Sequence, residues 1–113
     1  MEDIDTVVCG PVQLPIHSKP VYGLVLWPAA RVLAVWLAKF DSCGGPLLEL
    51  GCGAGLCGLA FAKATGAAAV LTDGEDDVLE LAKAKCGAEG PARCERAVLG
   101  SGLYARGRGK SSD

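Results

Sequence analysis

The feature that most constrains the fold is a group of three alternating glycines directly behind a short apolar segment. The segment is Leu47–Leu50, and the glycines are Gly51, Gly53 and Gly55. Apolar residues at helical spacing continue over 56–65. Glycine adopts the left-handed conformations that a sharp reversal needs, and it leaves the backbone open to a close neighbour. The pattern therefore predicts a buried strand, a tight turn and a helix, the repeating unit of a parallel α/β sheet.

Further apolar segments predict the rest of the sheet. Residues 68–72 form a second strand that ends at Asp73, an acidic loop starts a helix over about 76–86, and residues 94–99 form a third strand. Consecutive strands in such units lie next to one another. We therefore expect an α/β, Rossmann-like N-terminal half: a partial parallel sheet of order 3-2-1, flanked by helices.

A short extended segment precedes the sheet. Residues 6–16 predict two extended runs around a turn at Gly10 and Pro11. Pro15 confines the second run to an edge or an irregular segment, because proline lacks the N–H that a central strand needs. Residues 17–27 predict a connector whose single histidine is an ordinary residue rather than a general base.

Pro28 predicts the start of a helix over 28–40, since its fixed φ suits the first turn and its missing N–H is not needed there. The apolar residues of this helix predict one broad buried stripe, with Trp36 in the core. The stripe consists of Ala29, Ala30, Leu33, Trp36, Leu37 and Phe40.

Composition limits the class of protein. Half of the 113 residues are apolar and most of these are small, which predicts one domain over 1–99. Residues 100–113 are rich in Gly, Ser, Arg and Lys and predict a disordered basic tail. The net charge of −2 provides no general attraction to nucleic acid or an acidic membrane. No secretory signal is visible, so we expect a cytoplasmic or also nuclear protein, with six free cysteines and no metal site.

Two carboxylates are candidates for ligand binding. Asp73 lies 22 residues after Gly51, where a carboxylate can accept hydrogen bonds from ribose hydroxyls. Glu49 interrupts an apolar strand, and a buried carboxylate is unfavourable unless it is hydrogen-bonded. Glu49 either bonds neighbouring amides of the turn or faces a cationic ligand. The glycine turn itself could also belong to an α/β protein that binds no nucleotide. Gly53 to Gly58 also fits the dinucleotide pattern G-x-G-x-x-G, but the strand runs directly into Gly51.

Two motifs resemble a known family. The first is ELGCGAGL over 49–56, followed by LTD at 71–73, which resembles the signature of seven-strand S-adenosylmethionine-dependent methyltransferases. The second is the segment 23–37, which resembles the helix preceding the glycine motif in methyltransferase family 16, a family of protein-lysine methyltransferases. The resemblance covers about residues 4–99. It implies S-adenosylmethionine as cofactor and a protein lysine as methyl acceptor.

The resemblance also implies cofactor contacts by position. Trp27 would pack near the adenosine or methionine part, although it could instead be a core aromatic. Gly51, Cys52 and Gly53 would line the methionine and ribose, and Asp73 would hold the ribose diol. No catalytic residue is assigned. The cofactor-binding set is Trp27, Glu49, Gly51, Cys52, Gly53, Gly55 and Asp73.

The sequence departs from the family after its third strand. The family has a Trp-Gly pair there and an Asp/Glu-x-x-Tyr motif on a fourth strand, and neither occurs in this chain. We therefore expect a C-terminally truncated methyltransferase that is incomplete or inactive alone. Its strand 47–50 should expose an edge through which the chain self-associates. The alternatives are a non-catalytic module that binds cofactor or a partner, and an NAD(P)-binding oxidoreductase fragment.

Overall fold

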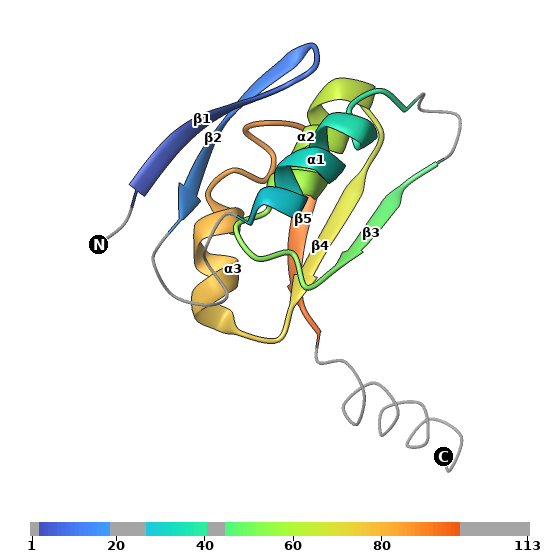
Figure 1. Ribbon diagram of the computed structural model, residues 1–113. Helices are drawn as coiled ribbons and strands as arrows, with labels where there is room; N and C mark the ends of the chain where they lie inside the picture. Colours follow the sequence, from blue (N-terminus) through green and yellow to red (C-terminus); the bar gives the residue numbers. More distant parts are fainter. Residues whose placement is uncertain (1–2, 19–26, 41–44, 98–113) are drawn as a thin grey trace.

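The computed structural model describes residues 3–18, 27–40 and 45–97, which form a two-stranded sheet, a three-stranded sheet and three helices (Figure 1). The three-stranded sheet and its helices confirm the predicted α/β class. The elements in chain order are β1 (Asp3–Cys9), β2 (Val12–Ser18), α1 (Pro28–Leu37), β3 (Leu47–Leu50), α2 (Leu56–Thr65), β4 (Ala69–Asp73), α3 (Asp76–Lys83) and β5 (Ala92–Arg96).

The larger sheet has the predicted order. Its strands are parallel and follow one another as β3-β4-β5, with Leu47 opposite Ala69 and Leu71 opposite Cys94. The third strand begins at Ala92, two residues earlier than expected, and ends at Arg96. Its start is extended because Ala69 N–H donates to the carbonyl oxygen just before β5, at 2.9 Å.

Only one face of this sheet is covered by helices within the described residues. Leu71 is fully buried, and α2 and α3 contact β4 and β5. Successive side chains of a strand point to opposite faces. Leu48 and Leu50 therefore lie on the other face, and they are 62% and 53% exposed. Parallel sheets are normally covered on both faces, so this second face is unusual.

The orientation of α1 differs from the expectation. The helix ends at Leu37 rather than at residue 40. Trp36 is 56% exposed, and its ring lies edge-on to Phe40 with a centroid separation of 4.4 Å. The prediction that Trp36 belongs to the core is therefore wrong, and the predicted stripe is displaced around the helix.

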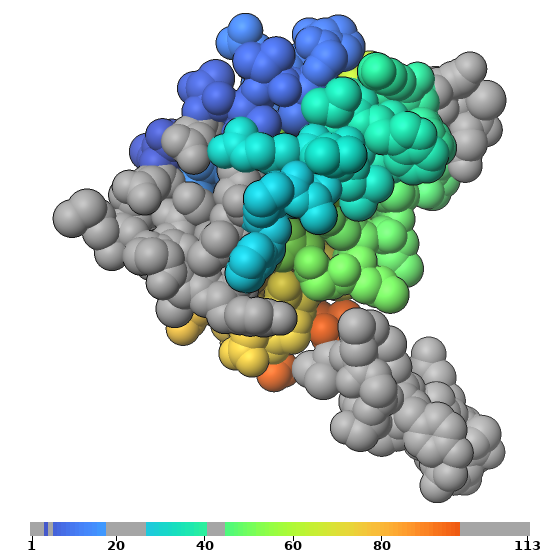
Figure 2. Space-filling model, viewed as in Figure 1, coloured from blue at the N-terminus to red at the C-terminus, as the bar shows by residue number. Residues whose placement is uncertain are grey.

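Small side chains explain which side of α1 is buried. Ala34 and Ala38 are buried, and the Cys57 thiol of α2 lies 3.4 Å from the Ala30 carbonyl oxygen. The distance between two helices is set by the side chains at their contact, so a tryptophan on this side would push α1 away. In the space-filling view, α1 lies on the surface between the blue hairpin and the green residues around β3 (Figure 2).

The two extended N-terminal runs form the antiparallel hairpin β1–β2, in which Asp3 pairs with Ser18 across a turn containing Gly10. Pro15 is tolerated because each strand of a two-stranded sheet is an edge. The hairpin packs against α1 and α2 through four buried side chains. These are Val7, Cys9, Leu14 and Ile16.

A predicted connector residue lies in a strand, and several predicted segments lie outside the described residues. His17, expected in a connector, lies in β2 opposite Ile4. Residues 19–26 of the connector, Cys43 and the predicted tail 100–113 lie outside the described residues. Among the described helices, none has the length and hydropathy to cross a membrane.

The outer edge of β3 has no partner strand among the described residues. The Leu47 N–H donates to the Ala68 carbonyl oxygen at 2.9 Å, so the backbone groups of Leu48 and Leu50 point away from β4. In the part of the chain that the structure describes, β3 has β4 as its partner strand and nothing pairs with this edge. Glu49 turns its carboxylate inward to the Gly58 amide, so it does not guard the edge.

We expect the chain to self-associate through this edge, as the sequence predicts. Leu48→Lys should weaken self-association at least about tenfold, because a charge on an edge strand opposes pairing and apolar burial is lost. Sedimentation velocity over a concentration series measures the effect. Val8→Lys is the matched control, since Val8 is 59% exposed on β1. Equal association of Leu48→Lys and wild type would place the contact elsewhere.

Candidate functional site

The candidate site lies where β3 and β4 end. The turn after β3 passes through Gly51, Gly53 and Gly55, whose φ angles are 69°, 56° and 89°. All three are left-handed, a region that favours glycine. The Cys52 N–H donates to the Thr72 carbonyl oxygen at 2.8 Å, which holds the turn against the end of β4.

The glycines of the turn serve different purposes. A Cβ on Gly51 would meet nothing within 4 Å, so glycine is needed there for conformation alone. A Cβ on Gly55 would lie 3.1 Å from Ala82 and 3.2 Å from Leu71. Gly55 therefore allows close packing in the core. Its contact with the cofactor stays a prediction, and such a contact would be made by its backbone atoms.

Asp73 joins the two loops at this end of the sheet. Its Oδ2 accepts the Gly53 N–H at 3.2 Å, and its Oδ1 accepts the Glu75 N–H at 3.2 Å. Each carboxylate oxygen can accept more than one hydrogen bond. The side chain is thus fixed by backbone amides while it keeps acceptor capacity for a vicinal diol.

Glu49 caps α2 from the neighbouring strand. Its Oε1 accepts the Gly58 N–H at 3.0 Å. The N-cap of α2 is Gly55, which has no side chain to satisfy the first amides of the helix. Glu49 supplies that acceptor, and its negative charge is favourable at a helix N-terminus. The sequence predicts that Glu49 either bonds amides of the turn or faces a cationic ligand; the amide that it bonds belongs to α2 and not to the turn.

Gly58 is a residue of the site that the sequence argument did not assign. A Cβ there would lie 2.7 Å from Leu71 and 2.9 Å from Glu49 Oε1. A side chain would therefore force Leu71 and the Glu49 carboxylate to shift, which would disturb the cap. The available signal was its place as the last glycine of the G-x-G-x-x-G pattern, where glycine allows close packing of helix and strand.

The carboxyl group of Glu49 has a pKa close to neutral pH. Burial raises the pKa of its carboxyl from 4.5 to about 7; the Gly58 amide opposes this rise and nearby Asp73 adds to it. A cation at this place would favour the carboxylate. The cap does not exclude a cationic ligand, because one carboxylate oxygen suffices for the amide.

The cysteines near the turn are unreactive thiols. Cys52 is buried, and burial raises its pKa far above the ordinary value, with Glu49 adding to the shift. Burial raises the pKa of Cys57 to about 12. The thiolate is the nucleophilic form of cysteine, so neither residue is a nucleophile at neutral pH. Cys52 instead fills space under the turn.

Trp27 lies at the same end of the molecule as the turn. It is the N-cap of α1, and its carbonyl oxygen accepts the Ala30 N–H at 3.0 Å. Ala30 in turn contacts Cys57, in the first turn of α2, so the two helices begin side by side. Trp27 is 50% exposed.

The acidic loop after β4 starts α3, as predicted, and it is exposed to solvent. Asp76 and Asp77 are exposed in the first turn of α3, where negative charge is favourable. Arg96 at the end of β5 donates to the Gly74 carbonyl oxygen at 3.2 Å and lies 3.6 Å from Asp76. Arg96 thereby holds the loop that follows Asp73.

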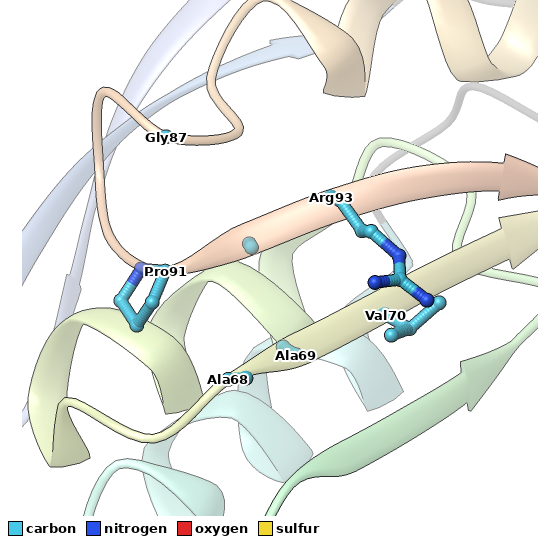
Figure 3. Close-up of a pocket in the computed structure, with 7 residues that line it drawn as sticks. Ala68, Ala69, Val70, Gly87, Pro91 and Arg93 are labelled. Carbon is cyan, nitrogen blue, oxygen red and sulfur yellow. The ribbon is translucent and has the colours of Figure 1, made fainter.

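A shallow depression of about 250 Å³ lies elsewhere, at the amino ends of β4 and β5 (Figure 3). Ligands of open α/β sheets bind at the carboxyl ends of the strands, so this depression is distinct from the candidate site. The depression is lined by Ala68, Ala69, Val70, Gly87, Pro91, Ala92 and Arg93.

Among the described residues, no group of three or more His, Cys, Asp or Glu side chains is placed to hold a metal ion.

The sequence was compared with models of known protein families. A family model described as lysine methyltransferase matches residues 13–99. The matched region runs from β2 to just beyond β5 and includes Trp27, the glycine turn and Asp73. A search of curated proteins found no match.

The raised pKa of Glu49 predicts that stability falls as pH rises from about 4.5 through 7. The unfolded chain releases this proton before the folded chain does, so the folded state loses relative stability over that range, by about 1–3 kcal/mol. Glu49→Gln keeps the acceptor oxygen but cannot ionise, and should remove this part of the pH dependence. Denaturant unfolding at pH 5 and 8 measures it, with Glu80→Gln on the exposed side of α3 as control. Equal pH dependence in wild type and Glu49→Gln would contradict the assignment.

Proposed function

The chain belongs to the lysine methyltransferase family, and from that premise we propose that it binds S-adenosylmethionine at the carboxyl ends of β3 and β4. The observation that carries the proposal is the placement of two carboxylates around one glycine turn. Asp73 bonds the Gly53 amide of the turn, and Glu49 lies beneath the helix that the turn begins. The methyl acceptor we propose is the lysine side chain of a protein.

The residues of the site match the chemistry of this cofactor. Asp73 has remaining acceptor capacity for the ribose hydroxyls. Glu49 carries a carboxylate for the sulfonium or the α-ammonium. Because its pKa is about 7, either cation would shift it toward the charged form at neutral pH. The turn of Gly51, Cys52 and Gly53 would line the methionine and ribose, and Trp27 offers an aromatic face to the adenosine or methionine part.

When bound, the cofactor supplies an electrophilic methyl group that a neutral amine attacks. The contribution of this chain is to orient the reactants and exclude water, which can supply much of the rate enhancement. Cys52 and Cys57 hold their protons at neutral pH and do not take part as nucleophiles. No catalytic residue is assigned among the described residues.

The NAD(P) alternative uses the same turn and the same Asp73. It differs at Glu49, because NAD has neither a sulfonium nor an ammonium to place there. The observation that favours S-adenosylmethionine over NAD is therefore the carboxylate beneath the turn.

The second candidate function is a non-catalytic module, and the open edge of β3 favours it. A sheet edge can accept a strand from a partner. We expect the chain alone to transfer methyl groups slowly, well below about 1 s⁻¹. A tritiated-methyl assay with cell lysate as acceptor tests this, and transfer at an ordinary enzymatic rate would exclude the non-catalytic alternative.

Calorimetric titration tests the assignment of the cofactor. We expect S-adenosylmethionine and S-adenosylhomocysteine to bind and NAD not to bind. Asp73→Ala should weaken binding by roughly 1.5–3 kcal/mol, the loss of a hydrogen bond to a charged group. Asp76→Ala and Asp77→Ala are matched controls, because both residues are exposed on α3. Binding of NAD alone, or equal affinities of all three variants, would overturn the assignment.

The pH dependence of binding tests whether Glu49 faces the cation. A cation stabilises the carboxylate, so affinity should rise about tenfold from pH 6 to pH 8, as the proton leaves a carboxyl with a pKa of about 7. Glu49→Gln should bind more weakly and lose that part of the slope. Glu80→Gln should match wild type. Wild-type affinity and slope in Glu49→Gln would show that Glu49 only caps α2.

A further inference from the structure

Two thiols that the proposed function does not use lie in contact. Cys86 follows the end of α3, and Cys94 lies in β5, which α3 contacts. Their Sγ atoms are 3.2 Å apart. Both are partly exposed, whereas Cys9, Cys52 and Cys57 are buried. The pair therefore combines proximity with access for a small molecule.

The backbone around the pair holds the two sulfurs in place. The Cys86 N–H donates to the Ala82 carbonyl oxygen at 3.2 Å, which continues α3 by one more bond. The Gly87 N–H donates to the Gly90 carbonyl oxygen at 3.1 Å, closing the turn that leads into β5. Cys94 is fixed opposite Leu71 in the sheet. A disulfide has an S–S distance of about 2.05 Å, so the sulfurs need to approach by about 1 Å.

We propose that Cys86 and Cys94 form a covalent modification site, a dithiol that a low-molecular-weight disulfide of the glutathione type oxidises to an intramolecular disulfide. The Cys86 thiolate attacks one sulfur of the oxidant, forms a mixed disulfide and releases the first small thiol. The Cys94 sulfur then attacks Cys86 Sγ and releases the second small thiol. The two protons of the protein thiols leave on the two small thiols, so the oxidant gains the two electrons that the protein loses.

The surroundings assign the order of attack. Burial raises the pKa of Cys94 to about 12, the hydrogen bond with Cys86 adds to the rise, and nearby Lys83 opposes it. Cys94 lies within the sheet opposite Leu71, whereas Cys86 lies in the turn beyond the end of α3, so we assign Cys86 as the first thiol to react and Cys94 as the resolving thiol. The disulfide would tie β5 to the end of α3, two residues before Arg96, which holds the loop after Asp73.

Mass spectrometry of the full chain tests the proposal. The reduced protein is incubated with oxidised glutathione, quenched with acid, denatured, and alkylated with N-ethylmaleimide. We expect six alkylated cysteines before oxidation and four after it, with the protein itself lighter by two hydrogens. Trypsin cleaves after Lys85, Arg93 and Arg96, so the expected product is residues 86–93 joined to residues 94–96 by the disulfide.

Three variants separate this site from general oxidation. Cys94→Ser should retain glutathione on Cys86 as a stable mixed disulfide, because the resolving thiol is missing. Cys86→Ser should leave Cys94 reduced. Cys43→Ser is the matched control and should still lose two thiols on oxidation. A cross-link that maps to other cysteines, or the same loss of thiols in all three variants, would overturn the proposal.

Discussion

The hydrogen bond from the Gly58 N–H to Glu49 Oε1 joins a strand, a helix and the turn between them. It requires glycine at 58, because a Cβ would lie 2.9 Å from the accepting oxygen. It also compensates for Gly55, an N-cap without a side chain. The same bond keeps a carboxylate in a place from which water is largely excluded, which raises its pKa to about 7. The raised pKa of Glu49 therefore follows from its burial, which the hydrogen bond of the cap offsets only in part.

The small residues of the chain determine how the layers are arranged. Gly55 and Gly58 let α2 approach Leu71 on the sheet, and Ala30 lets α1 approach Cys57 on α2. Close contact on these sides leaves the larger side chains on the opposite sides of the elements. Apolar surface therefore lies on the outer side of α1, and within residues 3–18, 27–40 and 45–97 no helix covers the sheet face that carries Leu48 and Leu50. Such surfaces mark contacts with other chains or segments.

Local pattern predicted the parts of this structure that depend on local physics. The strand-turn-helix conformation follows from an apolar segment and alternating glycines, because few residues other than glycine adopt left-handed turns. The order of the strands follows because consecutive parallel strands usually lie next to one another. The buried side of α1 could not be predicted, since both sides are apolar and the partner helix decides. The role of Gly58 and the contact between Cys86 and Cys94 depend on distances between elements, which a pattern along the chain does not contain.

The residues that would bind the cofactor are also the residues that hold this end of the sheet together. Asp73 fixes the Gly53 amide of the turn and the Glu75 amide of the next loop, and Glu49 fixes the helix. A ligand that bonds Asp73 or Glu49 therefore meets groups already oriented by the fold, which reduces the ordering that binding requires. Because the same carboxylates hold the backbone and would bind the ligand, replacing either one disturbs structure and binding together. Variants that keep the acceptor oxygen but remove the charge separate the two effects, because the backbone amides retain their partners.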